Sequence, residues 1–273
     1  MPEQFLHGVE VVQIDTGTRP IRTVRSSVIG LVGTAPDADA EKFPVNTPVL
    51  IAGKRADAAG LGATGTLAPA IDDIFDQTGA FVVVVRVDEG VDFATTMSNI
   101  IGGIDDDTGL PEGIQAFLSA ESVVKVAPRI LIAPEFSQEL AVATELVSAA
   151  DRLGGRTYLD GPNTTMADAI TYRENFGTKY ARMIDPWVKV WDTETSTEIV
   201  RPASARMAGA IAKEEAESGF WSKKSNIEIV GITGTARPIH YAHGDPNTEA
   251  NLLNENEVTT IIHVDGYRIF GNR

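Results

Sequence analysis

The chain has 273 residues, 43% of them hydrophobic, and carries a formal net charge of −15 at pH 7. A chain of this length buries roughly three quarters of its unfolded surface, so we expect one large domain, or one domain with an appendage. The negative charge argues against nucleic acid and anionic lipid as partners, because both require neutralising Lys and Arg side chains. The absence of Cys excludes disulfides and thiolate metal sites.

The N-terminus and the apolar runs give no sign of export or of membrane anchoring. No basic region followed by an apolar stretch comes after Met1, and the run of large apolar residues from Phe81 to Val85 is far too short to span a bilayer. The sequence therefore predicts a soluble product that stays in the cytoplasm where it is made.

An isolated β segment stands near the N-terminus, made of His7, Gly8, Val9, Glu10, Val11, Val12, Gln13 and Ile14. A turn-like stretch from Asp15 to Thr18 and then Pro20 close it. Nothing before the segment could form a hairpin with it, so it must pair elsewhere, on the chain's own sheet or at the open edge of a neighbour's sheet. We assign residues 1–20 to an N-terminal arm.

From Ser26 onward, short apolar strands alternate with amphipathic helices. The predicted strands are Ser27 to Gly33, Val49 to Ala52, Phe81 to Val87, Arg129 to Ala133, Arg156 to Asp160 and Trp187 to Trp191. Helical spacing of apolar residues appears from Leu67 to Phe75 and from Leu140 to Ala150. Continuous apolar strands separated by helices indicate an α/β fold with a mostly parallel sheet covered by helices.

The C-terminal part changes character. Ser204 to Ser218 is a predicted helix with Ser204 as N-cap and Gly219 just past its end, and Asn247 to Asn256 is a second, polar helix. Two β runs then meet across Asp265-Gly266, a dipeptide typical of type I′ hairpins. A terminal hairpin without a covering helix indicates an unfinished unit, so we divide the rest of the chain into an α/β body, 21–242, and the start of a truncated C-terminal domain, 243–273.

One loop imitates a dinucleotide-binding fingerprint. Gly60, Gly62 and Gly65 form a G-x-G-x-x-G before a predicted helix, and Asp88 follows at a strand end. In the true motif the first Gly follows its strand immediately, whereas residues 53–59 intervene here. The loop is either a Gly-rich connector, which we favour, or a nucleotide site.

Two polar clusters could suggest metal binding. Asp105-Asp106-Asp107 lacks the ligand alternation of a calcium loop, so we interpret it as a solvated loop. His240 and His243 are three residues apart in a predicted strand and turn, where they point to opposite faces. No catalytic, cofactor-binding or metal-binding constellation is predicted.

Motifs in the second half of the chain are more specific than any of these signals. They run from Arg201 to Ala212, Gly219 to Trp221, Ser225 to Gly234, Ala250 to Asn254 and Thr259 to Arg268. In this order they resemble the central motifs of tail sheath proteins of contractile phages and of related pyocin-type particles. The runs His7 to Val11 and Ser27 to Asp39 also resemble the opening of the sheath proteins of smaller temperate phages.

The resemblance implies a structural, non-enzymatic subunit that uses no cofactor. Such subunits form stacked, six-fold rings around an inner tail tube protein, between a baseplate and a tail terminator, and contract to drive the tube through the host envelope. Assembly in the host cytoplasm and a final place in the virion tail are implied, without nucleic-acid binding or membrane anchoring. Contraction is then a rearrangement between two packings of rigid subunits.

The resemblance also marks individual residues. Residues 7–14 correspond to an arm that adds a strand to a neighbouring subunit. The family motifs contain Arg206, Gly219, Phe220, Trp221, Asn251, Asn254, Gly266, Tyr267 and Arg268. Phe220 and Trp221 are either core anchors or interface residues, Tyr267 and Arg268 are expected mainly to support the hairpin, and both Asn residues are expected to hydrogen-bond locally.

Family members continue beyond the hairpin into the rest of a domain that receives neighbours' arms, so the resemblance predicts a C-terminally truncated chain. Two other functions remain open. A nucleotide-binding enzyme would use the Gly60–Gly65 loop and gain thermal stability with NAD, NADP or ATP. An adhesin-like surface module would stay monomeric and would not need its first residues.

Overall fold

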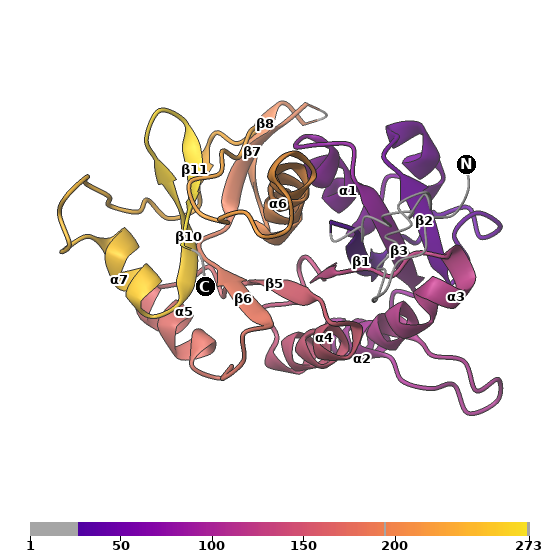
Figure 1. The fold of residues 1–273 in the computed structure, drawn as a ribbon. Helices are drawn as coiled ribbons and strands as arrows, with labels where there is room; N and C mark the ends of the chain where they lie inside the picture. The colour runs from indigo at the N-terminus through magenta and orange to yellow at the C-terminus, as the bar shows by residue number, and fades with distance from the viewer. Residues whose placement is uncertain (1–26, 194, 272–273) are drawn as a thin grey trace, which may run out of the picture.

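The computed structural model describes residues 27–193 and 195–271, which form an α/β body around one large sheet (Figure 1). The eight strands of this sheet lie in the order β11-β10-β6-β5-β4-β1-β3-β2. Their bounds in chain order are Ile29–Thr34 (β1), Pro48–Ala52 (β2), Phe81–Val87 (β3), Ile130–Ile132 (β4), Arg156–Asp160 (β5), Ala181–Ile184 (β6), Val258–His263 (β10) and Tyr267–Phe270 (β11). The predicted α/β class is confirmed.

The strands between the two edges, from β10 to β3, are parallel, whereas β11 and β2 pair antiparallel with their neighbours. Both faces of β1 and β3 are buried, which explains their unbroken apolar sequences. A small antiparallel sheet, in the order β8-β7-β9, contains Val188–Asp192 (β7), Thr197–Arg201 (β8) and Gly234–Thr235 (β9).

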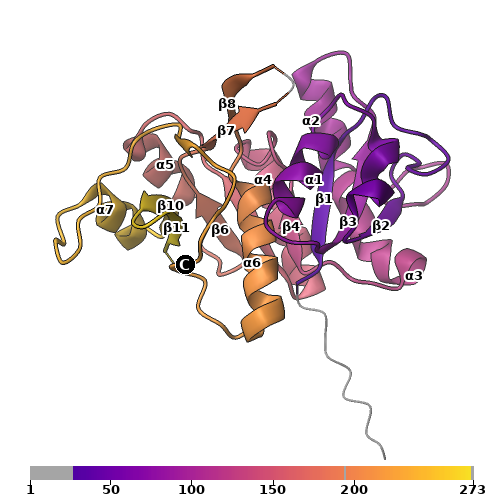
Figure 2. The same cartoon turned by 90° about the horizontal axis from the view of Figure 1, so that it is seen from above.

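Helices cover both faces of the large sheet (Figure 2). The buried apolar side chains form two clusters. Helices α1 (Leu67–Phe75) and α6 (Ser204–Ser218) pack in the first cluster, together with residues of β7. The second cluster holds α2 (Phe93–Ile101), α3 (Ala120–Val124), α4 (Leu140–Leu153), α5 (Met166–Arg173) and α7 (Glu249–Glu255). Two 3-10 helices, η1 (Arg55–Leu61) and η2 (Gly113–Ser119), complete the layers.

Several elements escaped sequence analysis. The strands β6 and β8 and the helices α2 and α5 were not predicted, because polar residues interrupt their short apolar patterns. The predicted strand from Trp187 to Trp191 exists as β7, but it belongs to the small antiparallel sheet and not to the parallel one. Periodicity located this strand without indicating which sheet it joins.

The predicted C-terminal hairpin is present, and φ is positive at both Asp265 (48°) and Gly266 (103°). His263 pairs with Tyr267, so residues 264–266 connect the strands and the turn is one residue longer than a type I′ turn. Through the pairing of β10 with β6, the hairpin extends the sheet of the body. The segment 226–229 lies along the outer side of β11 and exchanges backbone hydrogen bonds with it. The domain boundaries proposed from the sequence remain predictions, and the arm, residues 1–20, lies outside the described residues.

Candidate functional site: helix α6 and the exposed motif residues

Helix α6 carries the longest sequence motif and lies between the large sheet, the small sheet and α1 (Figure 1). Ten of its fifteen residues are buried, from Ser204 to Ala212 and at Glu215. At Gly209 the helix approaches α1 so closely that a Cβ atom would lie 2.7 Å from the Ile74 carbonyl oxygen. A glycine is needed there because of this close approach of the two helices.

Arg206 joins three elements from within α6. Its Nη2 atom donates to Asp73 Oδ1 at 2.7 Å and to Asp76 Oδ2 at 2.9 Å, both on or next to α1. Its Nη1 donates to the Val230 carbonyl oxygen at 3.0 Å. The side chain is only 3% exposed, so these contacts act in a largely desolvated setting. The motif arginine is therefore an internal anchor between α6, α1 and the segment before the hairpin.

The N-terminus of α6 is held by a buried carboxylate. Asp160, at the end of β5, accepts a hydrogen bond from the Ser204 backbone N–H at 2.9 Å and another from the Ser204 hydroxyl at 2.6 Å. Ser137 Oγ donates to the same side chain at 3.0 Å. Burial raises the pKa of Asp160 to about 6, while the hydrogen bonds from Ser204 and Ser137 oppose that rise.

The C-terminal half of α6 has its own polar anchor. Glu215 is fully buried and forms ion pairs with Arg156 of β5 and, at 3.1 Å, with Lys224. The helix is thus bonded at both ends to β5 and near its start to α1. Sequence analysis did not find Asp73, Asp160 or Glu215, because a carboxylate in a helix or at a strand end gives no signal of its distant partner.

Just beyond α6, the motif residues turn outward. Gly219 has φ of 90°, a backbone conformation that favours glycine, and its N–H donates to the Glu215 carbonyl oxygen at 3.0 Å. Phe220 and Trp221 are 60% and 77% exposed, and their rings meet edge to face with centroids 5.2 Å apart. Within the single chain these two aromatic residues are not core anchors.

The hairpin residues bind the preceding segment. Tyr267 donates its hydroxyl hydrogen to the Thr233 carbonyl oxygen at 2.7 Å. Arg268 donates from Nε to the Val264 carbonyl oxygen at 3.1 Å and from Nη1 to the Asn226 carbonyl oxygen at 3.3 Å. Both side chains therefore form hydrogen bonds that hold the hairpin and the segment before it together.

The two asparagines of α7 lie at the other side of the hairpin. The side-chain amide of Asn251 donates to the Asp245 carbonyl oxygen at 2.8 Å, six residues earlier in the chain. The side-chain oxygen of Asn254 lies beside Gly271, 3.3 Å from where a Cβ atom would stand. This motif therefore lies against the residue that follows β11.

The Gly60–Gly65 loop packs against the chain itself. A Cβ atom on Gly62 would lie 2.8 Å from the Asp37 side chain, and one on Gly65 would lie 2.4 Å from the Thr34 carbonyl oxygen. The adjacent pocket, of about 520 Å³, is lined in part by Glu89, Asp92 and Glu135, which would repel phosphate groups. The glycines serve this close packing, and a nucleotide site is not favoured.

The described residues contain neither a metal-binding cluster nor a membrane-spanning helix. No group of three or more His, Cys, Asp or Glu side chains within 27–193 and 195–271 could hold a metal ion. In the same part of the chain, no helix combines the length and apolar character needed to cross a membrane.

Comparison with family models gives two matches that together cover most of the chain. Residues 111–273 match the model described as phage tail sheath protein central domain. Residues 26–87 match the model described as tail sheath protein Gp18 domain III N-terminal region.

Relatives of known name are similar over nearly the whole chain. A protein named as a prophage major tail sheath protein of Pseudomonas aeruginosa is 43% identical over 98% of this chain and 69% of its own length. The tail sheath protein of Escherichia phage P2 is 41% identical over 98% of this chain and 69% of its own length. These relatives are longer than the present chain.

Solved structures share the fold at low sequence identity. A chain from the baseplate of the anti-feeding prophage in its contracted state has a TM-score of 0.65 and 18% identity, over 97% of this chain and 68% of that chain. A chain from the helical sheath of the same particle, also contracted, has a TM-score of 0.61 and 17% identity over the same shares.

Proposed function

The chain belongs to the phage tail sheath family, and on that premise we propose that copies of it assemble into the contractile sheath of a phage tail or of a related injection particle. The sheath would surround an inner tail tube protein, end at a baseplate and a tail terminator, and drive the tube through the host envelope on contraction. The single observation that carries this proposal is the family match over residues 111–273, supported by named sheath relatives over nearly the whole chain. The family is structural, and the chain is not an enzyme.

The internal anchors of α6 support a rigid subunit. Contraction of a sheath requires subunits that change neighbours while keeping their own fold. The buried contacts of Arg206, Asp160 and Glu215 hold α6 to α1 and β5 at three points. We infer that the body moves as one piece and that the free energy of contraction lies in contacts between subunits.

Residues 7–14 are our candidate donor strand. A β segment without a local partner can add to the edge of a neighbour's sheet. The exposed rings of Phe220 and Trp221 are a second candidate contact, because large exposed aromatic side chains are enriched at protein interfaces. Six-fold rings, assembly in the host cytoplasm and a final place in the virion tail are further parts of the same proposal.

Negative-stain electron microscopy of the purified chain, beside a variant lacking residues 1–18 at matched concentration, tests the proposal. Tubes or rings from the intact chain that disappear on deletion would support both self-assembly and the donor role of the arm. Monodisperse particles from both chains, across the whole accessible concentration range, would contradict self-assembly of this chain.

A further inference from the structure

A cluster of cations is the least expected surface feature of this acidic chain. A pocket of about 380 Å³ is lined in part by Arg173, Lys179, Arg182 and Glu257, which gives it three positive charges against one negative charge. The whole chain, in contrast, carries a formal charge of −15. The pocket is therefore a local concentration of positive charge that can attract carboxylates.

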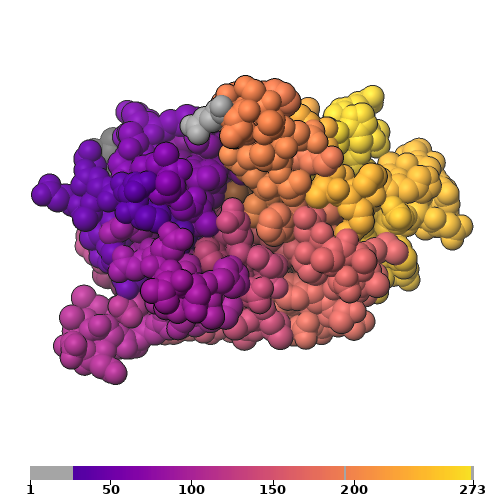
Figure 3. All heavy atoms as spheres, turned by 180° about the vertical axis from the view of Figure 1, so that it is seen from behind, coloured from indigo at the N-terminus to yellow at the C-terminus, as the bar shows by residue number. Residues whose placement is uncertain are grey.

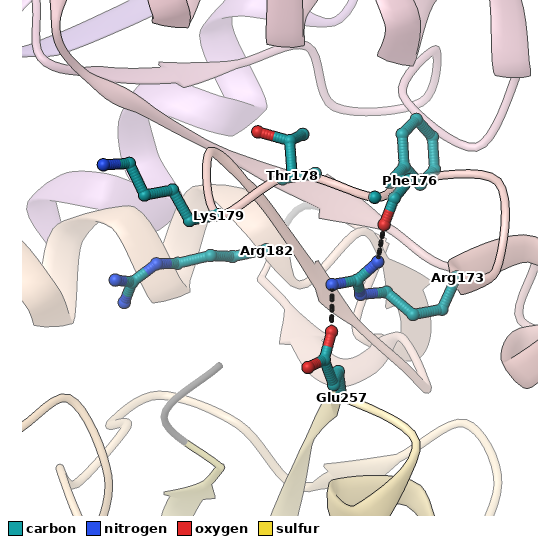
Figure 4. Close-up of a pocket in the computed structure, with 8 residues that line it drawn as sticks. Arg173, Phe176, Thr178, Lys179, Arg182 and Glu257 are labelled. Atoms are coloured by element: carbon teal, nitrogen blue, oxygen red, sulfur yellow. Dashed lines mark hydrogen bonds and ion pairs between the residues drawn. The ribbon is translucent and has the colours of Figure 1, made fainter.

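The cations of this pocket differ in how they are engaged (Figure 4). Arg173 is buried and binds both the Phe176 carbonyl oxygen and the Glu257 carboxylate, so it fixes the loop after α5. Lys179 and Arg182 point to the other side of the pocket, away from Glu257. Arg182 Nε is buried and has no hydrogen-bond partner among the described residues. Because that atom is closed to solvent, a partner cannot bind it directly. The charge open to a partner is that of Lys179 and Arg182, for which no ion pair occurs among the described residues.

The loop between α2 and η2, residues 103–112, has the opposite charge. We name it the acidic finger. It contains Asp105, Asp106 and Asp107 and no Lys or Arg. In the space-filling view it stands out from the body (Figure 3), and in Figure 1 it projects on the side away from α5. A chain therefore presents its finger and its pocket in different directions.

The finger is preformed. Its two sides are joined by an antiparallel bridge between Ile104 and Pro111, and the Asp105 N–H donates to the Leu110 carbonyl oxygen at 2.9 Å. Asp105 also accepts a hydrogen bond from the Asp107 backbone N–H at 3.1 Å, which fixes the tip. A preformed loop loses little conformational entropy when it binds.

The finger also exposes apolar surface that a partner could cover. Ile104 and Leu110 are 62% and 64% exposed and flank the acidic tip. Phe176 of the pocket is only 7% exposed and its ring packs against Tyr172, so the apolar surface of this contact comes mainly from the finger. The apolar flanks would exclude water around the charges on docking, which strengthens their attraction.

We propose that the acidic finger of one copy of this chain docks into the Arg173–Lys179–Arg182 pocket of a second copy, in a head-to-tail contact. Because finger and pocket are different patches facing different ways, the contact is heterologous and propagates into a ring or a helix. The inference rests on the proposed self-assembly and identifies one of its interfaces by residue.

Cysteine cross-linking tests this contact directly, because the chain has no Cys of its own. One variant carries Asp107→Cys and the other Lys179→Cys, both at exposed positions with intact neighbouring charges. Mixed under mild oxidation, they should form a disulfide-linked dimer at least about tenfold faster than control mixtures, since docking raises the local concentration of the two thiols. The controls pair Asp107→Cys with Lys213→Cys, and Lys179→Cys with Glu89→Cys.

A charge variant gives an independent result. Asp106→Asn with Asp107→Asn should weaken self-association of the chain in sedimentation velocity by about tenfold or more at low salt, where charge attraction is least screened. The matched control, Asp88→Asn with Glu89→Gln, removes two exposed charges elsewhere and should leave self-association unchanged.

The outcomes separate this inference from the proposed function. If the unmodified chain self-associates but the finger and pocket cysteines react no faster than the controls, the contact is wrong while self-assembly stands. If inorganic phosphate binds the pocket of a monomeric chain and no cross-link forms, the pocket is a small-anion site instead. A chain that stays monomeric at every concentration contradicts both proposals.

Discussion

Two arginines bind the C-terminal part of α1 at similar distances but in different environments. Arg55 reaches Asp72 and Asp76 at 2.7 and 2.6 Å, with its side chain 53% exposed. Arg206 reaches Asp73 and Asp76 at 2.7 and 2.9 Å, with its side chain 3% exposed. Distances alone would rank the two as equal. Burial decides how much each arginine contributes to stability, because water screens the ion pairs of Arg55 and is excluded from those of Arg206.

The largest effect should come from removing the buried arginine. Arg206→Met leaves the Asp73 carboxylate buried beside the more distant Arg201 and frees the Val230 carbonyl oxygen from one of its donors. We expect a loss of about 3 to 5 kcal/mol in the free energy of unfolding, the cost of breaking a buried ion pair. Urea denaturation followed by circular dichroism measures it.

The matched control is Arg55→Met, which removes two ion pairs of the same kind at the surface. Its expected cost is below about 1 kcal/mol. Equal losses for the two variants would contradict the view that burial decides. Adding Asp73→Asn to Arg206→Met should recover part of the loss, because the orphaned charge is then absent.

Asp160 sharpens the comparison, since it is a buried carboxylate that accepts hydrogen bonds, and no cation among residues 27–193 and 195–271 forms an ion pair with it. Its folded pKa of about 6 lies above the unfolded value near 3.8, so the folded state binds the proton more tightly. Its contribution to stability is full below about pH 4 and declines as pH rises through about 6. Asp160→Asn stays neutral throughout, and its amide can bond to the same Ser204 hydroxyl.

Asp160→Asn should therefore become more stable relative to the unmodified chain as pH rises from 4 to 7. The relative gain in the free energy of unfolding should be on the order of 3 kcal/mol. Chemical denaturation at four pH values measures this difference. Asp92→Asn, at an exposed N-cap, is the control: hydrogen bonds from Thr95 lower the pKa of Asp92, so its contribution to stability is lost only below about pH 4 and its difference should stay nearly constant between pH 4 and pH 7. A flat difference for Asp160→Asn would show that the carboxylate is not desolvated in solution.

The sequence predicted the parts of the fold that depend on local pattern. Strands β1 and β3 are continuous apolar runs, and the Asp265-Gly266 turn has the backbone angles that its residues favour. Helix α5 and strand β8 escaped, because each is short and mixed in polarity, and their stability comes from packing against distant elements.

In the candidate site, too, the sequence indicated what depends on local pattern and missed what depends on distant contacts. Arg206 and Trp221 were singled out by a motif, but no local pattern indicates that one is buried and the other exposed. The carboxylate partners of Arg206 lie more than a hundred residues earlier in the chain, so the sequence could not pair them. The pocket of Arg173, Lys179 and Arg182 depends on how β6 and α5 are placed, which only the tertiary structure shows.

The smallest expected effect on stability concerns the other end of α6. Phe220→Ser with Trp221→Ser should change the free energy of unfolding by no more than about 0.5 kcal/mol per residue, because both rings are mostly exposed and bury little against the chain. The same pair of substitutions should reduce self-association in sedimentation velocity, if these rings are covered by a second copy. The matched control for the loss of a surface indole is Trp191→Ser, because Trp191 lies on β7 and is 58% exposed.

A large loss of stability in the Phe220→Ser, Trp221→Ser variant would mean that the two rings pack on the chain in solution. If neither stability nor self-association changes, the two rings are not part of the interface. If stability is unchanged but self-association weakens, the body of α6 serves as an internal anchor and the residues just after it contact a second copy.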